Sequence, residues 1–223
     1  MISDDYAIII LVIAVFSVVQ SIFGMGILVF GTPTLVLLGY EFTGILQLLL
    51  PSSILISTFQ VANSSARGSV NQKHLFLLCV PSIICGIWIA TSFLVTNYIE
   101  YAIGSMLLAM SASRSRIQWQ VWLRHIVKRY EVLLHVFMGI IHGMTNLGGA
   151  LLAIYASATN KKKQQTRHAI AYYYLIFGIS QVITLIILGH FWLIIENWSL
   201  PIISALVYMI VGNYIFLKTD DVM

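Results

Sequence analysis

The stretch QSIFGMGILVFGTP (residues 20–33) interrupts an apolar run that is long enough to cross a membrane. Gly24 and Gly26 open this break, and Pro33 follows a short apolar piece. A second break, HGMTNLGG (residues 142–149), lies in the other half of the chain. Irregular backbone at membrane depth is tolerated only where protein buries it or where it lines a water-filled cavity. We therefore predict that the two breaks face each other inside a membrane protein and form a solute site.

The composition supports a membrane protein. The chain has 223 residues, of which 59% are hydrophobic and only 9% are charged, whereas soluble domains carry about 25% charged residues. Several runs of about 20 apolar residues can each span a bilayer as a helix. We predict an all-α polytopic membrane protein with about five full spans. The net charge of +4 is a topology signal in such a protein, and we predict no nucleic-acid partner.

The same order of parts occurs twice along the chain: a helix, a glycine break, a short apolar piece and two or more spans. A shift of 122 residues places Gln20 on His142 and Gly24 on Asn146. The piece 27–39 would rise only about 20 Å as a helix, which is too short to cross alone. The first repeat, 1–112, is predicted to hold a hairpin at 6–39 and spans at 44–62, 75–96 and 101–112. The second, shortened repeat, 131–223, is predicted to hold a hairpin at 132–159 and spans at 169–189 and 199–217.

The segment 113–130 differs from the rest because it is basic and aromatic. Trp119, Trp122, Ile126 and Tyr130 recur at steps of three and four residues, which places them on one face of a helix. Such a helix lies in the membrane interface, where its cations meet anionic lipid headgroups. The simpler interpretation is a linker between the two halves, and both interpretations are compatible.

The distribution of charge favours a particular topology. If each broken stretch crossed the membrane once, the 12 Lys and Arg residues would divide seven against five between the two sides. If each stretch instead turns at its glycines and leaves on the side it entered, all 12 fall on one side. Lys and Arg concentrate on the cytoplasmic side, so we predict two re-entrant hairpins of opposite orientation. This inverted-topology repeat places the N-terminus outside and the C-terminus in the cytoplasm, in a membrane such as a bacterial inner membrane.

The breaks are the predicted place of solute binding. Glycine allows close approach of the backbone, and helix N-termini present free N–H groups that suit a small anion. The predicted site residues flank the two breaks: Gln20, Ser21, Gly24, Gly26, His142, Thr145, Asn146, Gly148 and Gly149. Polar residues on the following spans are candidates to line the same cavity: Ser52, Ser53, Ser57, Ser180 and Gln181.

Each of these residues has a structural alternative. Glycine is common where membrane helices pack closely, and Gly139 and Gly143 have the small-xxx-small spacing. Serine in a span often bonds its own helix, and His142 could form a bond between helices instead of binding an anion. His135 lies seven residues before His142, but no matching ligand set accompanies the pair, so we predict no metal and no cofactor. Cys79 and Cys85 lack the CxxC spacing and are interpreted as packing residues.

The motifs resemble those of the sulfite exporter TauE/SafE family of membrane permeases, also called the 4-toluene sulfonate uptake permease family. Gly24, Gly26 and Pro33 match the first copy of the glycine-rich motif of that family, and Gly148 and Gly149 match the second. The stretch from Gly68 to Leu75, followed by Gly86 and Gly104, resembles the family's third and fourth segments. Met25 stands where another glycine is usual, and the second copy lacks the proline. The resemblance implies transport of a small anion such as sulfite or a sulfonate.

Two functions of different classes remain open from the sequence. The leading one is a secondary transporter for a small anionic solute, and the other is a non-transporting membrane subunit that acts as an assembly partner. A membrane-embedded enzyme is disfavoured because the spans carry no acid, metal set or nucleophile dyad. The sequence leaves open the substrate, the direction of transport, the coupling ion and whether the protein forms a homo-oligomer.

Overall fold

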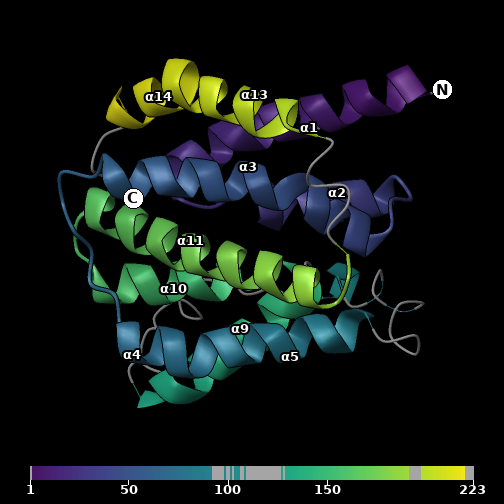
Figure 1. The fold of residues 1–223 in the computed structure, drawn as a ribbon. Helices are drawn as coiled ribbons and strands as arrows, with labels where there is room; N and C mark the ends of the chain where they lie inside the picture. Colours follow the sequence, from purple (N-terminus) through teal and green to yellow (C-terminus); the bar gives the residue numbers. More distant parts are fainter. Residues whose placement is uncertain are drawn as a thin grey trace.

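The computed structural model describes residues 2–91, 129–190 and 197–218, together with isolated positions between 98 and 127. The described chain is a bundle of helices (Figure 1). The helices are α1 (Ile2–Phe23), α2 (Thr32–Leu37), α3 (Phe42–Ala62), α4 (Gln72–His74), α5 (Val80–Thr91), α9 (Glu131–Thr145), α10 (Gly149–Thr159), α11 (Lys163–Ile187), α13 (Ser199–Val207) and α14 (Asn213–Lys218). Wider π-helical turns join some of them: η1 (Ile27–Gly31), η2 (Leu75–Cys79) and η3 (Tyr208–Gly212).

Five helical stretches are long and apolar enough to cross a membrane: Tyr6–Phe23, Phe42–Ala62, Gln72–Thr91, Lys163–Ile187 and Ser199–Lys218. Large apolar side chains on the outside of the bundle, such as Leu11, Trp88 and Ile210, are more than half exposed. An apolar outer surface suits contact with lipid, so the described chain has the build of a polytopic membrane protein. Most residues of the predicted span 101–112 and of the interfacial helix 113–130 lie outside the described residues.

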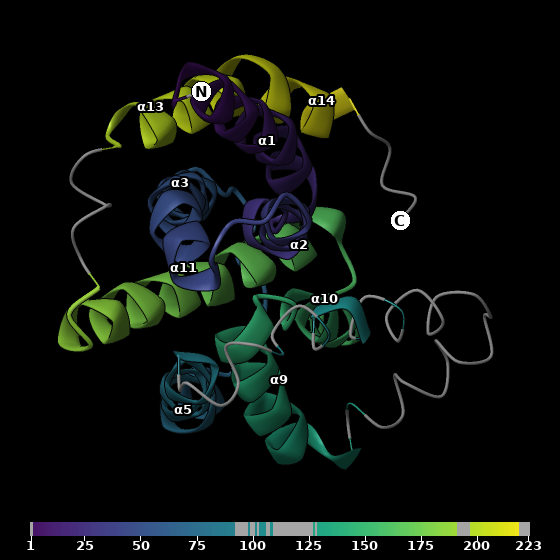
Figure 2. The same cartoon turned by 90° about the vertical axis from the view of Figure 1, so that its right-hand side faces the viewer.

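The chain reverses at the first glycine break and returns along α1. The α1 helix ends at Gly24, whose φ of 79° is in the left-handed region that glycine adopts without strain. The rings of Phe16 and Phe30 stack with their centroids 5.8 Å apart, so η1 runs antiparallel to α1. Pro33 lies in the first turn of α2, where its missing N–H costs no helical bond. Figure 2 shows α2 surrounded by α1, α3 and α11.

The second break makes a similar hairpin from α9 and α10. Asn146 ends α9 with a φ of 61°, and its N–H bonds the carbonyl of His142 at 2.9 Å. The ring of Tyr155 on α10 lies 4.8 Å from that of His135 on α9, which shows that the two helices run antiparallel. Both glycine breaks are therefore helical turns that reverse the chain.

The helices of the two halves interleave in a regular pattern. The α3 and α11 helices, each of which follows a hairpin, pack against each other at the centre. The α5 helix of the first half packs on α9, and α13 of the second half packs on α1. The α5 and α13 helices also pack on α11 and α3, respectively. Each half thus places its second span on the hairpin of the other half.

The described cations gather at one end of the bundle. The loop after α3 contains Arg67, and its Ser69 N–H donates to Asn160 Oδ1 at 2.7 Å, just before the lysines of residues 161–163. Lys163 Nζ donates to the carbonyl of Phe216 at 2.7 Å, which brings the end of α14 to the same place. The N-terminus of α1 and the start of α3 lie at the opposite end (Figure 1). This arrangement agrees with the separation of charge on which the topology prediction rests.

The structure differs from the sequence prediction at the start of α11. The predicted span 169–189 begins too late in the sequence, because Lys163–His168 already form the first turns of α11. Charged side chains are compatible with a helix, and here Arg167 and Lys163 both lie over the Phe216 ring, at 3.3 and 4.2 Å from its centroid. The helix therefore continues beyond its apolar part toward the cationic end.

Candidate solute-binding site

The buried side chain of Gln20 forms hydrogen bonds across the first break and to α3. Its side chain is fully buried, and its Oε1 accepts from the N–H of Ile27 at 3.1 Å. Its Nε2 donates to the carbonyl of Ser53 at 2.9 Å and to Ser57 Oγ at 3.2 Å, both on α3. Gln20 therefore holds the first hairpin to α3, and its amide would have to give up these bonds before it could bind a solute.

The glycines of the first break are sites of close packing. A Cβ on Gly26 would lie 2.5 Å from the backbone nitrogen of Gln20, and one on Gly24 would lie 2.8 Å from the carbonyl oxygen of Arg167. Ser21 Oγ donates to the carbonyl of Ser17 on its own helix at 2.6 Å. Arg167 Nη1 donates to the Ser21 carbonyl at 3.0 Å. The first break is thus bonded to α11 and α3 by groups that already have partners.

Asn146 joins the second break to two other elements. Its Nδ2 donates to Thr32 Oγ1 at 2.8 Å, and its Oδ1 accepts from Gln181 Nε2 at 2.8 Å. Thr32 begins α2 in the first hairpin, and Gln181 lies on α11. The nearby Thr145 Oγ1 donates to the carbonyl of Ile141 at 2.7 Å and accepts from the N–H of Leu147 at 3.2 Å. The tip of the second hairpin is therefore fixed against the return arm of the first hairpin, which is the segment 27–37 formed by η1 and α2.

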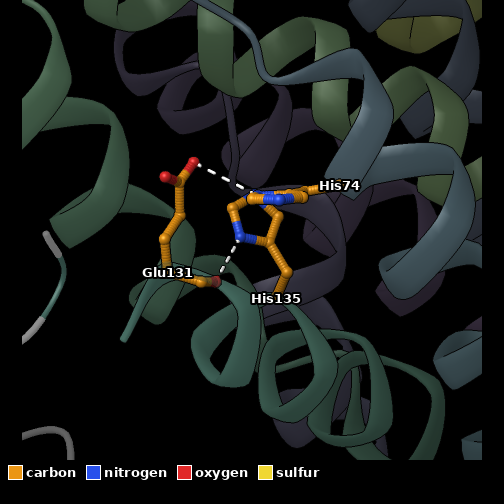
Figure 3. Close-up of side chains that lie close together, drawn as sticks. All are labelled: His74, Glu131 and His135. Atoms are coloured by element: carbon orange, nitrogen blue, oxygen red, sulfur yellow. Dashed lines mark hydrogen bonds and ion pairs between the residues drawn. The ribbon is translucent and has the colours of Figure 1, made fainter. Parts of the chain in front are cut away.

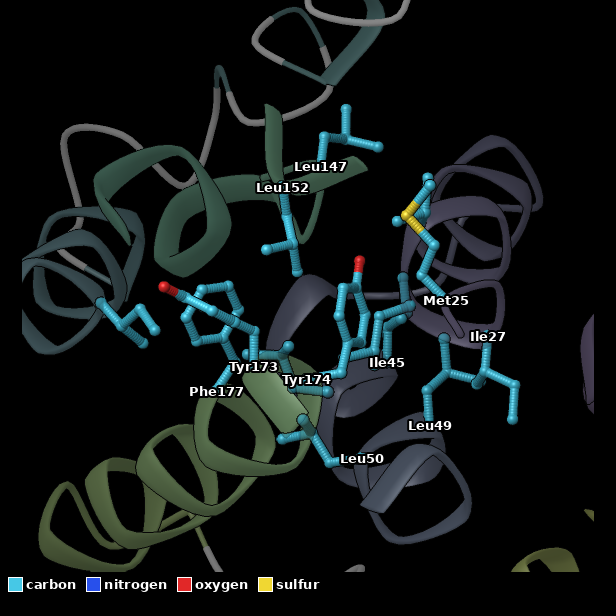
Figure 4. Close-up of a cluster of buried hydrophobic side chains, with 14 of the residues drawn as sticks. Met25, Ile27, Ile45, Leu49, Leu50, Leu147, Leu152, Tyr173, Tyr174 and Phe177 are labelled. Atoms are coloured by element: carbon cyan, nitrogen blue, oxygen red, sulfur yellow. The ribbon is translucent and has the colours of Figure 1, made fainter. Parts of the chain in front are cut away.

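Gly149 brings the N-terminus of α10 very close to Tyr174. A Cβ on Gly149 would lie 1.9 Å from the Tyr174 hydroxyl and 2.7 Å from Cγ2 of Val29. Gly148 packs on its own hairpin, since its Cβ would lie 2.5 Å from the Met138 carbonyl. Figure 4 shows the Tyr174 ring between side chains of the second hairpin, such as Leu152, and those of the first. Only a glycine leaves room for that hydroxyl.

Unpartnered polar atoms concentrate beside the second break. In the part of the chain that the structure describes, six buried side-chain atoms have no hydrogen-bond partner. Four of these belong to three residues: both ring nitrogens of His142, the Tyr174 hydroxyl and Gln181 Oε1. The ring centroids of His142 and Tyr174 are 5.4 Å apart, and Gln181 lies next to His142 without a well-formed hydrogen bond. Buried polar groups in native proteins are nearly always paired, so this cluster is a candidate for a binding site.

The two breaks do not meet tip to tip. The first lies against Arg167 and Ile170 near the start of α11, whereas Asn146 of the second lies against Gln181 on the same helix. From residue 170 to residue 181 a helix rises by about 16 Å, so the breaks are offset along α11. The contact between the hairpins is instead made by Val29 and Thr32 of the return arm.

The structure also adds a residue that the sequence analysis missed. Tyr174 is fully buried and lies in a run of three tyrosines, residues 172–174, inside an apolar helix. A buried tyrosine normally finds a partner for its hydroxyl. Three consecutive tyrosines in an apolar helix were therefore the feature of the sequence that could have indicated a site here. Ser180 Oγ, by contrast, donates to the carbonyl of Ile176 four residues earlier on its own helix.

The helix-packing interpretation of Gly139 and Gly143 is confirmed. A Cβ on Gly143 would lie 2.3 Å from the Ile83 carbonyl oxygen, and one on Gly139 would lie 2.7 Å from the Cys79 carbonyl oxygen. A reciprocal Gly86 on α5 approaches α9 equally closely. Helices in lipid gain little from apolar burial, so such close backbone contact is a main source of their association.

The fold and the site together define a helical membrane protein with paired broken helices, an arrangement that secondary transporters use. The family model of the sulfite exporter TauE/SafE family matches residues 9–221, nearly the whole chain, and the protein belongs to this family. The family is one of membrane transporters for sulfite and related anions. No curated protein and no solved structure matches the chain.

Proposed function

We propose that the protein carries a small anion across the inner membrane, and that the anion binds beside the second break. Sulfite, a sulfonate or another small organic anion has the size and charge that fit a compact site of neutral donors. The observation that carries the proposal is the group of unpartnered polar atoms on His142, Tyr174 and Gln181. Four buried polar atoms without hydrogen-bond partners lower the stability of the fold, and hydrogen bonds to a bound solute would offset this loss.

The chemistry of these groups suits an anion. His142 and the Tyr174 hydroxyl can each donate a hydrogen bond. The α10 helix begins at Gly149, beside the Tyr174 hydroxyl and without a side-chain cap, so the positive end of its dipole lies near these groups. The first break contributes through the return arm, where Thr32 holds Asn146.

The packing of the two halves supports transport by alternating access. Each half places its second span on the hairpin of the other, which is the pattern expected for an inverted repeat. In this proposal both hairpins are re-entrant, the N-terminus faces outward and the cationic end faces the cytoplasm. Relative motion of the halves would then expose the second break to one side at a time.

Flux into proteoliposomes tests the proposal. We expect the purified protein to carry sulfite or a small sulfonate down a gradient. Replacing Tyr174 by Phe removes one donor to a charged solute, which is worth about 1.5–3 kcal/mol, so the apparent KM should rise roughly 10- to 100-fold. Ser180→Ala is the matched control, because that hydroxyl bonds its own helix and should not affect KM.

Two outcomes would overturn the proposal. Absence of anion flux from stably reconstituted protein would reject the transporter and favour the assembly partner. Normal flux with an unchanged KM in both Tyr174→Phe and His142→Gln would keep the transporter but reject the site beside the second break.

A further inference from the structure

Three side chains with metal-binding groups meet at the cationic end of the bundle, away from the proposed solute site. Glu131 and His135 lie four residues apart on α9 and so share one face of the helix. His74 ends α4 and faces them, as Figure 3 shows. Each of the three offers one ligand atom, and these atoms lie within 4.8 Å of one another. In the sequence, His135 lies seven residues before His142. In the fold, His135 instead lies beside His74, with the two ring centroids 5.2 Å apart.

The hydrogen bonds show which nitrogen of each histidine carries a lone pair, and each of these lone pairs accepts one hydrogen bond. His135 Nδ1 lies 2.7 Å from the backbone carbonyl of Glu131, and since a carbonyl only accepts, the N–H is assigned to Nδ1. The lone pair is then on Nε2, which accepts from the Tyr173 hydroxyl at 2.9 Å. His74 Nδ1 accepts from Asn71 Nδ2 at 2.9 Å. A histidine that donates its other N–H to a backbone carbonyl is the usual form in a metal site.

Hydrogen bonds also orient the carboxylate of Glu131. Glu131 Oε1 accepts from the Tyr155 hydroxyl and from Asn71 Nδ2, both at 2.9 Å. Burial alone would raise the pKa of Glu131, but the hydrogen bonds from Asn71 and Tyr155 help to hold it below its ordinary value. The two donors hold Oε1 in place, 3.4 Å from His74 Nδ1.

We propose that His74, Glu131 and His135 form a binding site for a divalent transition-metal ion of the Zn²⁺ type. Ligands held tetrahedrally at about 2.1 Å from zinc lie about 3.4 Å apart, and His74 Nδ1 is 3.4 Å from Glu131 Oε1. Binding of the ion requires Asn71 to release His74 Nδ1 and Tyr173 to release His135 Nε2, with a small movement of the His135 side chain. Two imidazoles and one carboxylate suit zinc and its neighbours, whereas Mg²⁺ prefers oxygen ligands.

Binding at this site would tie the two halves of the chain together. His74 belongs to the segment that follows α3 in the first half, whereas Glu131 and His135 begin the hairpin of the second half. An ion that binds the folded protein but not the unfolded chain raises the melting temperature. At a free concentration 100-fold above Kd, the melting temperature should rise by about 5–10 °C for a chain of this size.

Titration of the tag-free, detergent-solubilised full chain with ZnCl₂ tests the site. We expect saturable binding of one Zn²⁺ by calorimetry, with a rise in melting temperature, and no comparable response to MgCl₂. His74→Gln and Glu131→Gln should each weaken Zn²⁺ binding by at least about 10- to 100-fold. Both side chains are partly exposed, so these variants should fold, and their metal-free melting curves verify this.

His190→Gln is the matched control, because His190 is exposed and lies at the opposite end of α11. It should bind Zn²⁺ like the wild type. The proposal is overturned if the wild type shows no saturable Zn²⁺ binding, or if His74→Gln and Glu131→Gln bind Zn²⁺ as tightly as His190→Gln does. None of these outcomes depends on transport, so the metal site and the proposed function fail or stand separately.

Discussion

Replacing Gly149 by Ala should destabilise the protein more than the addition of a single methyl group usually does. The new Cβ would lie 1.9 Å from the Tyr174 hydroxyl and 2.7 Å from Cγ2 of Val29, whereas ordinary contacts begin at 3.4 Å. The hydroxyl must therefore retreat by about 1.5 Å within a fully buried site, and such overpacking costs about 1–3 kcal/mol. For a chain of this size, the melting temperature should fall by roughly 2–12 °C.

Combining Gly149→Ala with Tyr174→Phe tests whether the loss of stability comes from the clash with the Tyr174 hydroxyl. Tyr174→Phe removes the oxygen that the new methyl group meets first, while the ring carbon at 2.9 Å and Val29 remain. The double variant should therefore recover part of the loss, with a coupling energy on the order of 0.5–3 kcal/mol. Gly44→Ala is the matched control: no atom lies within 4 Å of its Cβ, and alanine favours a helix, so it should be neutral or slightly stabilising.

Thermal unfolding in detergent, followed by circular dichroism, measures the wild type and the four variants: Gly149→Ala, Tyr174→Phe, the double variant and Gly44→Ala. The reasoning is refuted if Gly149→Ala melts like Gly44→Ala. It is also refuted if the effects of Gly149→Ala and Tyr174→Phe on stability simply add, since additive effects would show that the methyl group and the hydroxyl do not meet. A fall in melting temperature with partial recovery in the double variant supports the packing described at the tip of α10.

Gly143→Ala should destabilise the protein at least as strongly as Gly149→Ala, because its Cβ would meet the backbone carbonyl of Ile83 at 2.3 Å and only separation of α5 from α9 relieves the clash; an unchanged melting temperature would contradict this. Glu131 has a lowered pKa, so its stabilising contribution is present above its unfolded-state pKa and is lost as the pH falls through its folded-state pKa. The difference in melting temperature between wild type and Glu131→Gln should thus shrink as the pH falls from neutral into the acidic range where carboxylates titrate, and a constant difference would disprove it. Single cysteines at Glu41 and Lys162, in a background without the native cysteines, should react with an impermeant reagent from outside and from the cytoplasm, respectively; labelling of both from one side would reject the proposed topology.

The sequence was sufficient to locate the helices and their interruptions. Long apolar runs predict spans because unpaired backbone groups are costly in lipid, and the described spans agree with that prediction. Gly24 adopts a positive φ where the sequence placed the first break, and Asn146 does so at the second. The charges were equally informative, because the described cations lie at one end of the bundle.

The tertiary structure decided which side chains meet. Gln20 was predicted to contact the solute, but it bonds Ser53 and Ser57 and so has partners of its own. Tyr174 was not singled out, yet its unpartnered hydroxyl lies at the second break.

The fold also settled how the hairpins are offset along α11 and how His74 comes to face His135. These facts depend on the rotation and axial position of each helix. Hydropathy carries little of this information in a membrane protein, because the side of a helix that faces lipid and the side that faces its neighbours are both apolar. The sequence by itself therefore determined where the chain turns, and only the packing of the helices determined what each turn touches.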